Sequence, residues 1–547
     1  MWRQINIGAC ETGFAPLEKD GRRVSTHSAR TAAGEAFPAF EAFAKTYAAG
    51  QPQVVWTRLV ADLETPVSAY LKLCSGKPMS LLLESVEGGA ARGRYSIIAF
   101  EPSLVWRASG NTAEVSTNPL AKKPVFKTES QPTLASLRAL LSASRLELPP
   151  DLPPMAAGVF GYMGYDTIRL VENLPNEKPD SLGVPDAVLI RPTIVVIFDN
   201  VKDEMTLVTT VHPEDGTKAD KAYKAATKRL KKVIDALDRP IEHASLPSLR
   251  KLVAPEPTSN TTEAEYLGMV AKAKDYIRAG DIFQVVLSQR FSAPFALSSF
   301  ALYRSLRRMN PSPFLFHLDL GGFSLVGSSP EILVRVRDGR VTIRPIAGTA
   351  RRGADDAEDK ALAAALISDP KERAEHLMLL DLGRNDVGRV AKVGTVEVTD
   401  QFVVERYSHV MHIVSNVVGR LDDAKDSVDA LMAGFPAGTV SGAPKVRAME
   451  VIDELEKAKR GPYAGCVGYF TADGEMDTCI VLRTAIVKDG MLHVQSGAGI
   501  VYDSVPASEQ QECINKAKAI VRAAEDAIRF AARSKTGASR GNGGPFG

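Results

Sequence analysis

The sequence predicts an α+β protein built on large antiparallel β-sheets. Strand-like and helix-like apolar patterns follow one another without the regular strand–helix–strand period that a parallel sheet requires. Some strand-like runs are direct neighbours in the chain, such as residues 190–199 and 204–212, and such neighbours commonly pair as antiparallel strands. We therefore expect antiparallel sheets with helices packed around them.

The first part of the chain begins with a polar segment. Residues 1–50 are rich in polar and small side chains, and we expect an N-terminal extension there. Strand patterns then occupy residues 54–56, 78–85 and 94–100. Residues 219–237 have the period of an amphipathic helix, whose basic run is most simply a solvated face.

A stretch rich in Pro, Ser and Thr at residues 255–262 marks the expected boundary between two regions, residues 51–255 and 256–530. The second region is expected to end in a helix that reaches about residue 530. Residues 531–547 are rich in Gly, Ser and Arg, and we expect a disordered tail there. The last helix has an apolar stripe formed by Ile514, Ala517, Val521, Ala524 and Ile528.

The composition favours small molecules and proteins as partners. Among 547 residues, 67 basic and 65 acidic side chains leave a net charge of +2, so no broad positive field for nucleic acid or an anionic membrane is expected. No apolar run has the length of a membrane span or the pattern of a signal peptide. The five scattered cysteines, Cys10, Cys74, Cys466, Cys479 and Cys513, favour reduced thiols and a cytoplasmic protein.

Two predicted helix starts each carry a pair of glutamates three residues apart. Asp369 can cap a helix that begins at Pro370, with Glu372 and Glu375 on one face; Glu509 and Glu512 repeat that spacing after Pro506. Acids in a first turn are also favoured by the helix dipole, so either pair alone fits an ordinary solvated helix start. If the two starts face one another, the four carboxylates need a hard cation, of which Mg²⁺ is the usual one.

Four longer segments stand in a fixed order: residues 345–349 (PIAGT), 375–386 (EHLMLLDLGRND), 435–445 (FPAGTVSGAPK) and 497–501 (GAGIV). They resemble segments of chorismate-utilising enzymes, and the chain most closely resembles the family of anthranilate synthase large subunits over roughly residues 50–530. The resemblance implies large antiparallel sheets in a sandwich flanked by helices. It also implies the conversion of chorismate and ammonia to anthranilate and pyruvate, the first committed step of tryptophan biosynthesis.

The resemblance assigns roles to individual residues. Glu375 and Glu512 match the main Mg²⁺ ligands, with Glu372 and Glu509 as second acids. Catalytic positions fall on His412, assigned to proton transfer in pyruvate elimination, and on Thr439 and Gln284. The substrate-binding positions are Gly348, Thr349, Tyr463, Arg483, Gly497, Ala498, Gly499 and Lys516.

Without the resemblance, the residues admit blander interpretations. The glycines and threonines would be turn residues, His412 a satisfied core histidine and Lys516 a surface base. Arg483 is expected within an apolar strand, where a guanidinium requires an anionic partner.

Two positions distinguish this chain from relatives. Isochorismate and salicylate synthases have a water-activating Lys where this chain has Gln284, so ammonia is the expected nucleophile. One large group of aminodeoxychorismate synthases has a Lys that attacks the ring in place of Ala347, which cannot do so. Aminodeoxychorismate synthase component I remains the alternative enzyme, and a catalytically silent tryptophan-sensing relative remains the alternative of another class.

The source of ammonia must be a second protein. The sequence has no Gly-x-Cys-x-Gly nucleophile elbow, and its nearest match, residues 464–468 (AGCVG), lacks the first glycine. The resemblance therefore implies a separate glutamine amidotransferase small subunit (component II). Homo- and hetero-oligomers are both compatible with the sequence.

The resemblance also implies feedback inhibition by L-tryptophan through elements of the N-terminal lobe. The matching residues are Leu83, Glu84, Ser85, Asn310, Pro311, Ser312, Pro313, Phe314, Leu315 and Cys479. Many relatives have Tyr-Met where this chain has Phe314-Leu315, and sheet core with a Pro-rich turn explains the same residues.

Overall fold

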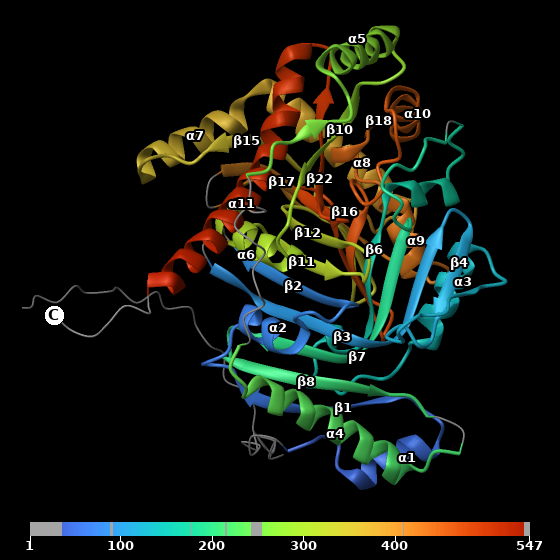
Figure 1. Cartoon of the computed structure of the whole chain (residues 1–547). Coiled ribbons are helices and arrows are strands. Elements are labelled where there is room, and N and C mark those ends of the chain that lie inside the picture. The colour runs from blue at the N-terminus through green and yellow to red at the C-terminus, as the bar shows by residue number, and fades with distance from the viewer. Residues whose placement is uncertain are drawn as a thin grey trace, which may run out of the picture.

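The computed structural model describes residues 35–87, 91–175, 177–213, 216–241, 254–407 and 410–540. Strands from both halves of the chain form one connected β network with helices around it (Figure 1). Every strand pairing within these residues is antiparallel. The predicted α+β class with large antiparallel sheets is confirmed.

The elements have the following bounds. The helices are α1 (Phe40–Ala48), α2 (Pro66–Cys74), α3 (Thr133–Ala143), α4 (Ala219–Leu237), α5 (Glu263–Ala279), α6 (Ser299–Met309), α7 (Asp356–Ser368), α8 (Pro370–Gly388), α9 (Ser427–Gly434), α10 (Lys445–Leu455) and α11 (Pro506–Arg540), with short 3₁₀ turns η1 (Pro154–Ala156), η2 (Tyr165–Leu170) and η4 (Gly438–Val440). The strands are β1 (Gln53–Val60), β2 (Ser80–Glu87), β3 (Ala91–Ser109), β4 (Thr112–Ser116), β5 (Lys127–Thr128), β6 (Gly158–Met163), β7 (Ala187–Asp199), β8 (Glu204–Val211), β9 (Thr258–Ser259), β10 (Gln284–Pro294), β11 (Phe314–Asp319), β12 (Ser324–Ser329), β13 (Ile332–Arg337), β14 (Arg340–Ile343), β15 (Ile346–Arg351), β16 (Glu397–Arg406), β17 (Val410–Arg420), β18 (Gly442–Ala443), β19 (Cys466–Thr471), β20 (Met476–Ile480), β21 (Thr484–Lys488) and β22 (Met491–Ile500).

Two branches of the sheet diverge from β7. One branch runs from β7 through β3, β2, β11, β12, β21 and β22 to β10, and the other through β6, β19, β20, β13 and β14 to β17. Phe160 and Tyr162 of β6 lie in one buried cluster with Phe316 of β11 and Leu325 of β12, so the branches face each other across a shared core. Because β2 pairs with β11 and β6 with β19, the regions on the two sides of residue 255 share sheets.

Helix α11 packs against β22 and β10, at the end of the first branch. Its predicted apolar stripe is confirmed, since Ala517, Val521, Ala524 and Ile528 are buried and Ile514 packs against the same core. The helix continues to Arg540, beyond the end expected near residue 530, and Ala531 is itself buried. Residues 541–547 of the predicted disordered tail lie outside the described part of the chain.

The N-terminal boundary also differs from the expectation. Residues 1–34 lie outside the described part of the chain, whereas α1 belongs to the fold: Phe43 is fully buried and Phe37 bridges to Trp56 of β1. The expected extension is therefore shorter than 50 residues. Cys10 also lies outside the described residues, and the other four cysteines are buried free thiols.

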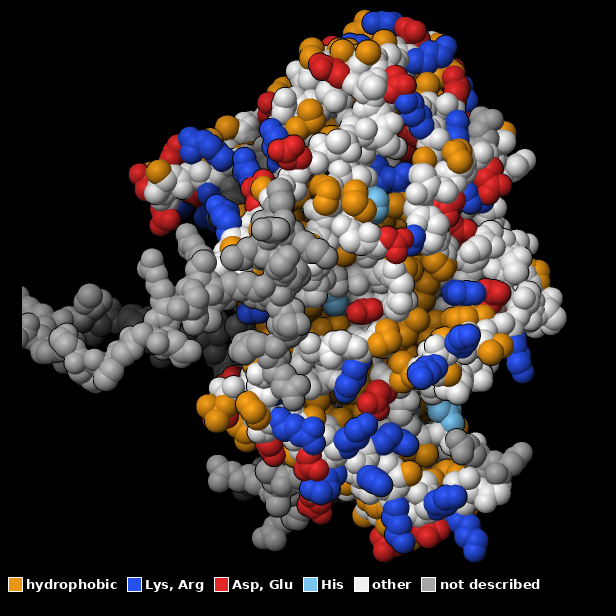
Figure 2. Space-filling view, in the orientation of Figure 1, with side chains coloured by type: hydrophobic (Ala, Val, Ile, Leu, Met, Phe, Trp, Pro, Cys, Tyr) orange, Lys and Arg blue, Asp and Glu red, His pale blue; other side chains and the backbone are white. Residues whose placement is uncertain are grey.

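The face drawn in Figure 2 carries both basic and acidic side chains, and basic ones gather at its lower end over α4. The net charge of the whole chain is +2. No helix in the described residues combines the length and hydropathy needed to cross a bilayer.

Close strand packing at β6 gives a stability prediction. A Cβ on Gly161 would lie 2.0 Å from the carbonyl oxygen of Val188 on β7. Gly161→Ala is therefore expected to lower the free energy of unfolding by about 1–3 kcal/mol, the usual cost of overpacking. The matched control is Gly268→Ala in α5, where an added methyl meets nothing within 4 Å and gains about 0.5–1 kcal/mol of helix propensity. Urea denaturation measures both; equal stabilities for the two variants would contradict the packing at β6.

Candidate active site

The two glutamate-bearing helix starts form as predicted. Asp369 caps α8, where its carboxylate accepts hydrogen bonds from the backbone N–H groups of Lys371 and Glu372 at 2.8 and 3.1 Å, and Pro370 takes the first helical position. Helix α11 begins at Pro506 and carries the second pair of acids in its first turns.

These helix starts converge. Burial raises the pKa of Glu375, and the negative charges of Glu372 on its own helix and of Glu512 on α11 raise it further. Burial and the charge of Glu512 likewise raise the pKa of Glu509. The acids of α8 and α11 thus lie close enough to repel one another.

The donor set fits a hard dication, although no three ligating side chains in the described ranges are arranged as a ready metal site. The acids supply only carboxylate oxygens, the ligands that Mg²⁺ prefers. The Lys516 ammonium forms an ion pair with Glu512 at 2.6 Å, so one positive charge already offsets part of the repulsion. The assignment of Glu372, Glu375, Glu509 and Glu512 as metal ligands stays a prediction.

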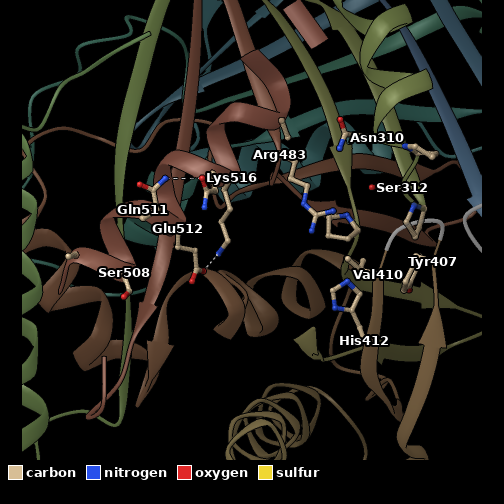
Figure 3. Close-up of a pocket in the computed structure, with 16 residues that line it drawn as sticks. Asn310, Ser312, Tyr407, Val410, His412, Arg483, Ser508, Gln511, Glu512 and Lys516 are labelled. Atoms are coloured by element: carbon tan, nitrogen blue, oxygen red, sulfur yellow. Dashed lines mark hydrogen bonds and ion pairs between the residues drawn. The ribbon is translucent and has the colours of Figure 1, made fainter. Parts of the chain in front are cut away.

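A cavity of about 780 Å³ has Glu512 in its wall, whereas Glu372, Glu375 and Glu509 are not among the residues that line it. Figure 3 shows Glu512 and Lys516 of α11 on one wall, with Arg483 and His412 on the other. Its lining residues are Asn310, Pro311, Ser312, Pro313, Pro330, Tyr407, Val410, His412, Arg483, Ala507, Ser508, Gln511, Glu512, Asn515, Lys516 and Ala519.

His412 on β17 is held in one orientation. Strand pairing sets it opposite Thr349 of β15, and its Nδ1 lies 2.9 Å from the carbonyl oxygen of Gly348 and 3.1 Å from Oγ1 of Thr349. Because a carbonyl only accepts, Nδ1 carries the proton and Nε2 keeps a lone pair. Burial lowers the pKa of His412, so the ring is neutral near pH 7 and can act as a base.

Arg483 does not lie in a strand, and that expectation is wrong. It occupies the link between β20 and β21 with a left-handed φ of 47°, and its carbonyl accepts a hydrogen bond from the Ser328 N–H at 3.2 Å. The apolar run Ile480-Val481-Leu482 conceals this bend in the sequence. The bend lets the guanidinium reach into the cavity, where a ligand could contact it (Figure 3).

The glycine-rich end of β22 meets several predicted binding residues. A Cβ on Gly497 would lie 3.1 Å from the Tyr463 hydroxyl, and Lys516 Nζ donates to the Gly497 carbonyl at 3.0 Å. A Cβ on Gly499 would lie 2.5 Å from Nε2 of Gln284, so only glycine admits that amide. Ala498 between them is fully buried.

Gln284 begins β10 and is 5% exposed. Its Oε1 has no hydrogen-bond donor among the described residues, so the amide presents an unused acceptor beside Gly499. A small N–H donor would satisfy it.

Glu331, between β12 and β13, was missed by the sequence reasoning. The Thr439 hydroxyl donates to its Oε1 at 2.9 Å. Burial raises the pKa of Glu331 to about 8, against the lowering effects of the Thr439 and Ile346 hydrogen bonds and the Arg483 charge. An acid following Ser-Ser-Pro within an apolar run was the available signal. At neutral pH this side chain carries a proton that it can donate.

A second cavity, of about 560 Å³, contains most of the predicted tryptophan residues. Leu83, Glu84, Ser85, Pro313, Phe314, Leu315 and Cys479 line it, whereas Asn310, Pro311 and Ser312 line the first cavity. Pro313, Pro330 and Tyr407 line both. The sequence reasoning missed Arg94, Arg335, Arg337, Arg344 and Asp477, which bring charge to the second cavity.

Comparisons with known proteins show which family the chain belongs to. The model of the chorismate binding enzyme family matches residues 88–522. The anthranilate synthase component 1 of Cereibacter sphaeroides is 56% identical over 499 residues, which cover 91% of this chain and 99% of that protein. The chain belongs to the anthranilate synthase component 1 family of chorismate-binding enzymes.

Other relatives agree. The anthranilate synthase component 1 of Pseudomonas aeruginosa is 47% identical, with 85% of this chain and 94% of that protein covered. The crystal structure of anthranilate synthase component I from Streptococcus pneumoniae matches with a TM-score of 0.68 and 39% identity over 78% of this chain and 92% of that one. The menaquinone-specific isochorismate synthase of Escherichia coli, at 20% identity and a TM-score of 0.64 over 89% of this chain and 99% of that one, shares the fold. The predicted chorismate-utilising enzyme fold is confirmed.

The raised pKa of Glu331 predicts how the free energy of unfolding depends on pH. Its pKa is about 8 when folded and 4.5 in the unfolded chain, so the folded protein binds the extra proton between these values. The protonated Glu331 carboxyl therefore stabilises the folded protein fully below pH 4.5, and this stabilisation is lost as the pH rises through 8. Glu331→Gln removes that loss while its amide oxygen still accepts from Thr439.

The difference in unfolding free energy, Gln variant minus parent, is expected to rise from pH 5 to pH 8. Thermal unfolding at a series of pH values measures it. Glu263→Gln, at an exposed position of α5, is the control and should show no such rise. A flat difference for Glu331→Gln would show that the carboxyl is ionised in the folded protein.

Proposed function

We propose that this chain is the chorismate-converting component of an anthranilate synthase, a cytoplasmic enzyme of tryptophan biosynthesis. The reaction joins chorismate and ammonia and yields anthranilate, pyruvate and water. The observation that carries the proposal is the first cavity, where the basic Nε2 of His412 and the cations Arg483 and Lys516 surround a space beside the acids of α8 and α11.

Substrate binding follows from charge. Chorismate has two carboxylates, and Arg483 and Lys516 supply fixed and mobile positive charge on facing walls of the cavity. Arg483 cannot lose its charge near neutral pH, so it serves as the permanent anchor. Backbone groups beside Gly348 and Gly497, where side chains would clash, complete the wall.

Glu375 and Glu512 would hold Mg²⁺, with Glu372 and Glu509 at the metal or its waters. When bound, the ion would neutralise the ring carboxylate and favour loss of the nearby hydroxyl. Burial and the neighbouring acids raise the pKa of Glu375, which means that its ionised form is destabilised. A cation bound here would stabilise that ionised form, which supports the proposed metal site.

In the amination step, ammonia forms a bond to a ring carbon as the ring hydroxyl departs. The unused Oε1 of Gln284 can accept an N–H of ammonia and orient its lone pair. The protonated Glu331 can give its proton to the departing hydroxyl, which leaves as water; the new ammonium group then releases a proton to solvent, from which Glu331 is protonated again. A glutamine amide cannot deprotonate water, so attack of water on the ring in place of ammonia is not promoted.

In the elimination step, His412 Nε2 removes the proton from the ring carbon that carries the new amino group. The C–O bond to the enolpyruvyl group then breaks, the ring becomes aromatic, and the departing enol takes up a proton and becomes pyruvate. The Gly348 carbonyl steadies the protonated imidazole through Nδ1–H.

Ammonia is expected to come from a separate amidotransferase, component II, because the chain lacks a glutaminase nucleophile elbow. The numbered name of its relatives, component 1, supports a second component.

The test is incubation of the purified chain with chorismate, Mg²⁺ and an ammonium salt. We expect anthranilate fluorescence and pyruvate in equal amounts, and no turnover when glutamine replaces ammonium. The double variant Glu375→Gln/Glu512→Gln is the inactive control, since it keeps side-chain size and removes two of the charges.

Each alternative outcome has a clear meaning. An aminated chorismate without pyruvate would identify an aminodeoxychorismate synthase, and absence of any product would favour a silent tryptophan-binding relative. Glutamine-dependent turnover by the chain alone would refute the need for component II.

We further propose that L-tryptophan binds in the second cavity and inhibits the enzyme. The cavity offers guanidinium groups for a carboxylate and a buried oxygen, Oδ1 of Asp477, that lacks a donor and could accept from an ammonium. Glu84 is less available, because Arg307 and the Tyr303 hydroxyl already bind its carboxylate.

Asp477→Asn is expected to weaken tryptophan inhibition by about tenfold or more, the scale of losing a charge-assisted hydrogen bond. Inhibition curves of the ammonium-dependent reaction measure it, with Asp381→Asn, on the exposed surface of α8, as the control. Unchanged inhibition of Asp477→Asn would place the effector elsewhere.

A further inference from the structure

Beside the cavity, an arginine that no step above uses is completely enclosed. Arg460 follows α10 and is 2% exposed, and Glu456 at the end of α10 is 5% exposed. Arg460 Nε donates to Oε2 of Glu456 at 2.9 Å and Nη2 to Oε1 at 2.5 Å. A bidentate pair removed from water in this way persists only where its remaining donors and acceptors are also satisfied.

The remaining hydrogen bonds of Arg460 reach two segments that carry predicted site residues. Nη1 donates to the Val440 carbonyl in η4, and Nη2 donates to the Val286 carbonyl of β10, each at 2.7 Å. The guanidinium also lies 5.6 Å from the ring centre of Tyr463. Val440 adjoins Thr439, and Val286 lies two residues from Gln284.

Glu456 extends the same network. Its Oε1 accepts from both the backbone N–H and the hydroxyl of Ser288 on β10, each at 2.8 Å. The Ser288 hydroxyl in turn accepts from Nε2 of Gln495 on β22 at 2.9 Å. One ion pair therefore ties η4, β10 and β22 together.

We infer that Arg460, paired with Glu456, is a positioning residue for the reaction: it fixes the Thr439 segment against the strand of Gln284, and so sets where the proton donor Glu331 and the incoming nucleophile meet. This inference rests on the proposed function. Thr439 reaches Glu331 through its hydroxyl, while Gln284 sits at the start of the strand that Arg460 holds. A shift of one segment relative to the other separates groups that must act together.

A neighbouring ion pair offers a matched control. Asp453, one turn earlier on α10, binds Arg169 at 2.6 and 2.7 Å, and Arg169 donates to the Leu174 carbonyl at 3.0 Å. This pair is also largely buried, but its arginine holds Leu174, in a segment that carries none of the predicted site residues. The two pairs differ mainly in what they hold.

The experiment compares Glu456→Gln/Arg460→Met with Asp453→Asn/Arg169→Met. The Glu456/Arg460 variant removes a whole pair and leaves no buried charge unpaired. Because Arg169 Nε also donates to Oδ1 of the buried Asp166 at 3.3 Å, the control variant carries Asp166→Asn as well. Ammonium-dependent anthranilate formation is measured well below the unfolding temperature of each variant. We expect kcat of the Glu456/Arg460 variant to fall about 10- to 100-fold with a smaller change in KM for chorismate, and the control to keep kcat within about threefold.

Arg460→Lys provides a second arm if the double variant fails to fold. Lysine keeps the charge opposite Glu456 but cannot bridge both carbonyls, so kcat should again fall more than KM rises. Full kcat in either folded Arg460 variant, or an equal loss in the control, would overturn the inference and leave the pair a stabilising element. If the parent chain itself formed no anthranilate, the proposed function would be refuted instead.

Discussion

Repulsion among the carboxylates of α8 and α11 is the constraint that the site must withstand. Burial and neighbouring acids raise the pKa of Glu375, and the ammonium groups of Lys371 and Lys516 offset only part of that effect. The helix starts therefore need attachments that do not depend on the acids. His376 of α8 forms a 2.6 Å hydrogen bond with Ser415 of β17, and Gln510 of α11 accepts one of the same length from Gln289 of β10.

The strands that anchor the helices also carry two of the proposed reacting groups. Ser415 shares β17 with His412, and Gln289 shares β10 with Gln284. Each helix start is thus attached to the same strand as the proposed base or the proposed ammonia-orienting amide. Catalytic geometry of this kind tolerates errors of well under an ångström, which explains why buried polar bonds rather than apolar contacts alone fix the helix starts.

Local signals in the sequence were enough for part of this architecture. Asp369 followed by proline gave the start of α8, and register-matched segments gave His412, Lys516 and the four acids. Arg483 and Glu331 were harder, because a left-handed turn and a raised pKa arise only from packing. The expected division at residue 255 likewise gives no hint that β2 pairs with β11, since strand partners so distant in sequence leave no local pattern.

Tyr407, directly after β16, illustrates the same limit and bears on the proposed inhibition by tryptophan. Tyr407 lines both cavities, its ring lies 5.6 Å from that of His412, and its hydroxyl donates to Glu405 at 2.9 Å. Glu405 is paired with Arg344, whose side chain lines the second cavity, and it lies opposite His412 in the β16–β17 register. A ligand that draws Arg344 toward itself loosens Glu405 and with it the support of Tyr407. Binding in the second cavity can then change the surroundings of His412 without any rearrangement of the sheet, provided the ligand prefers that altered state.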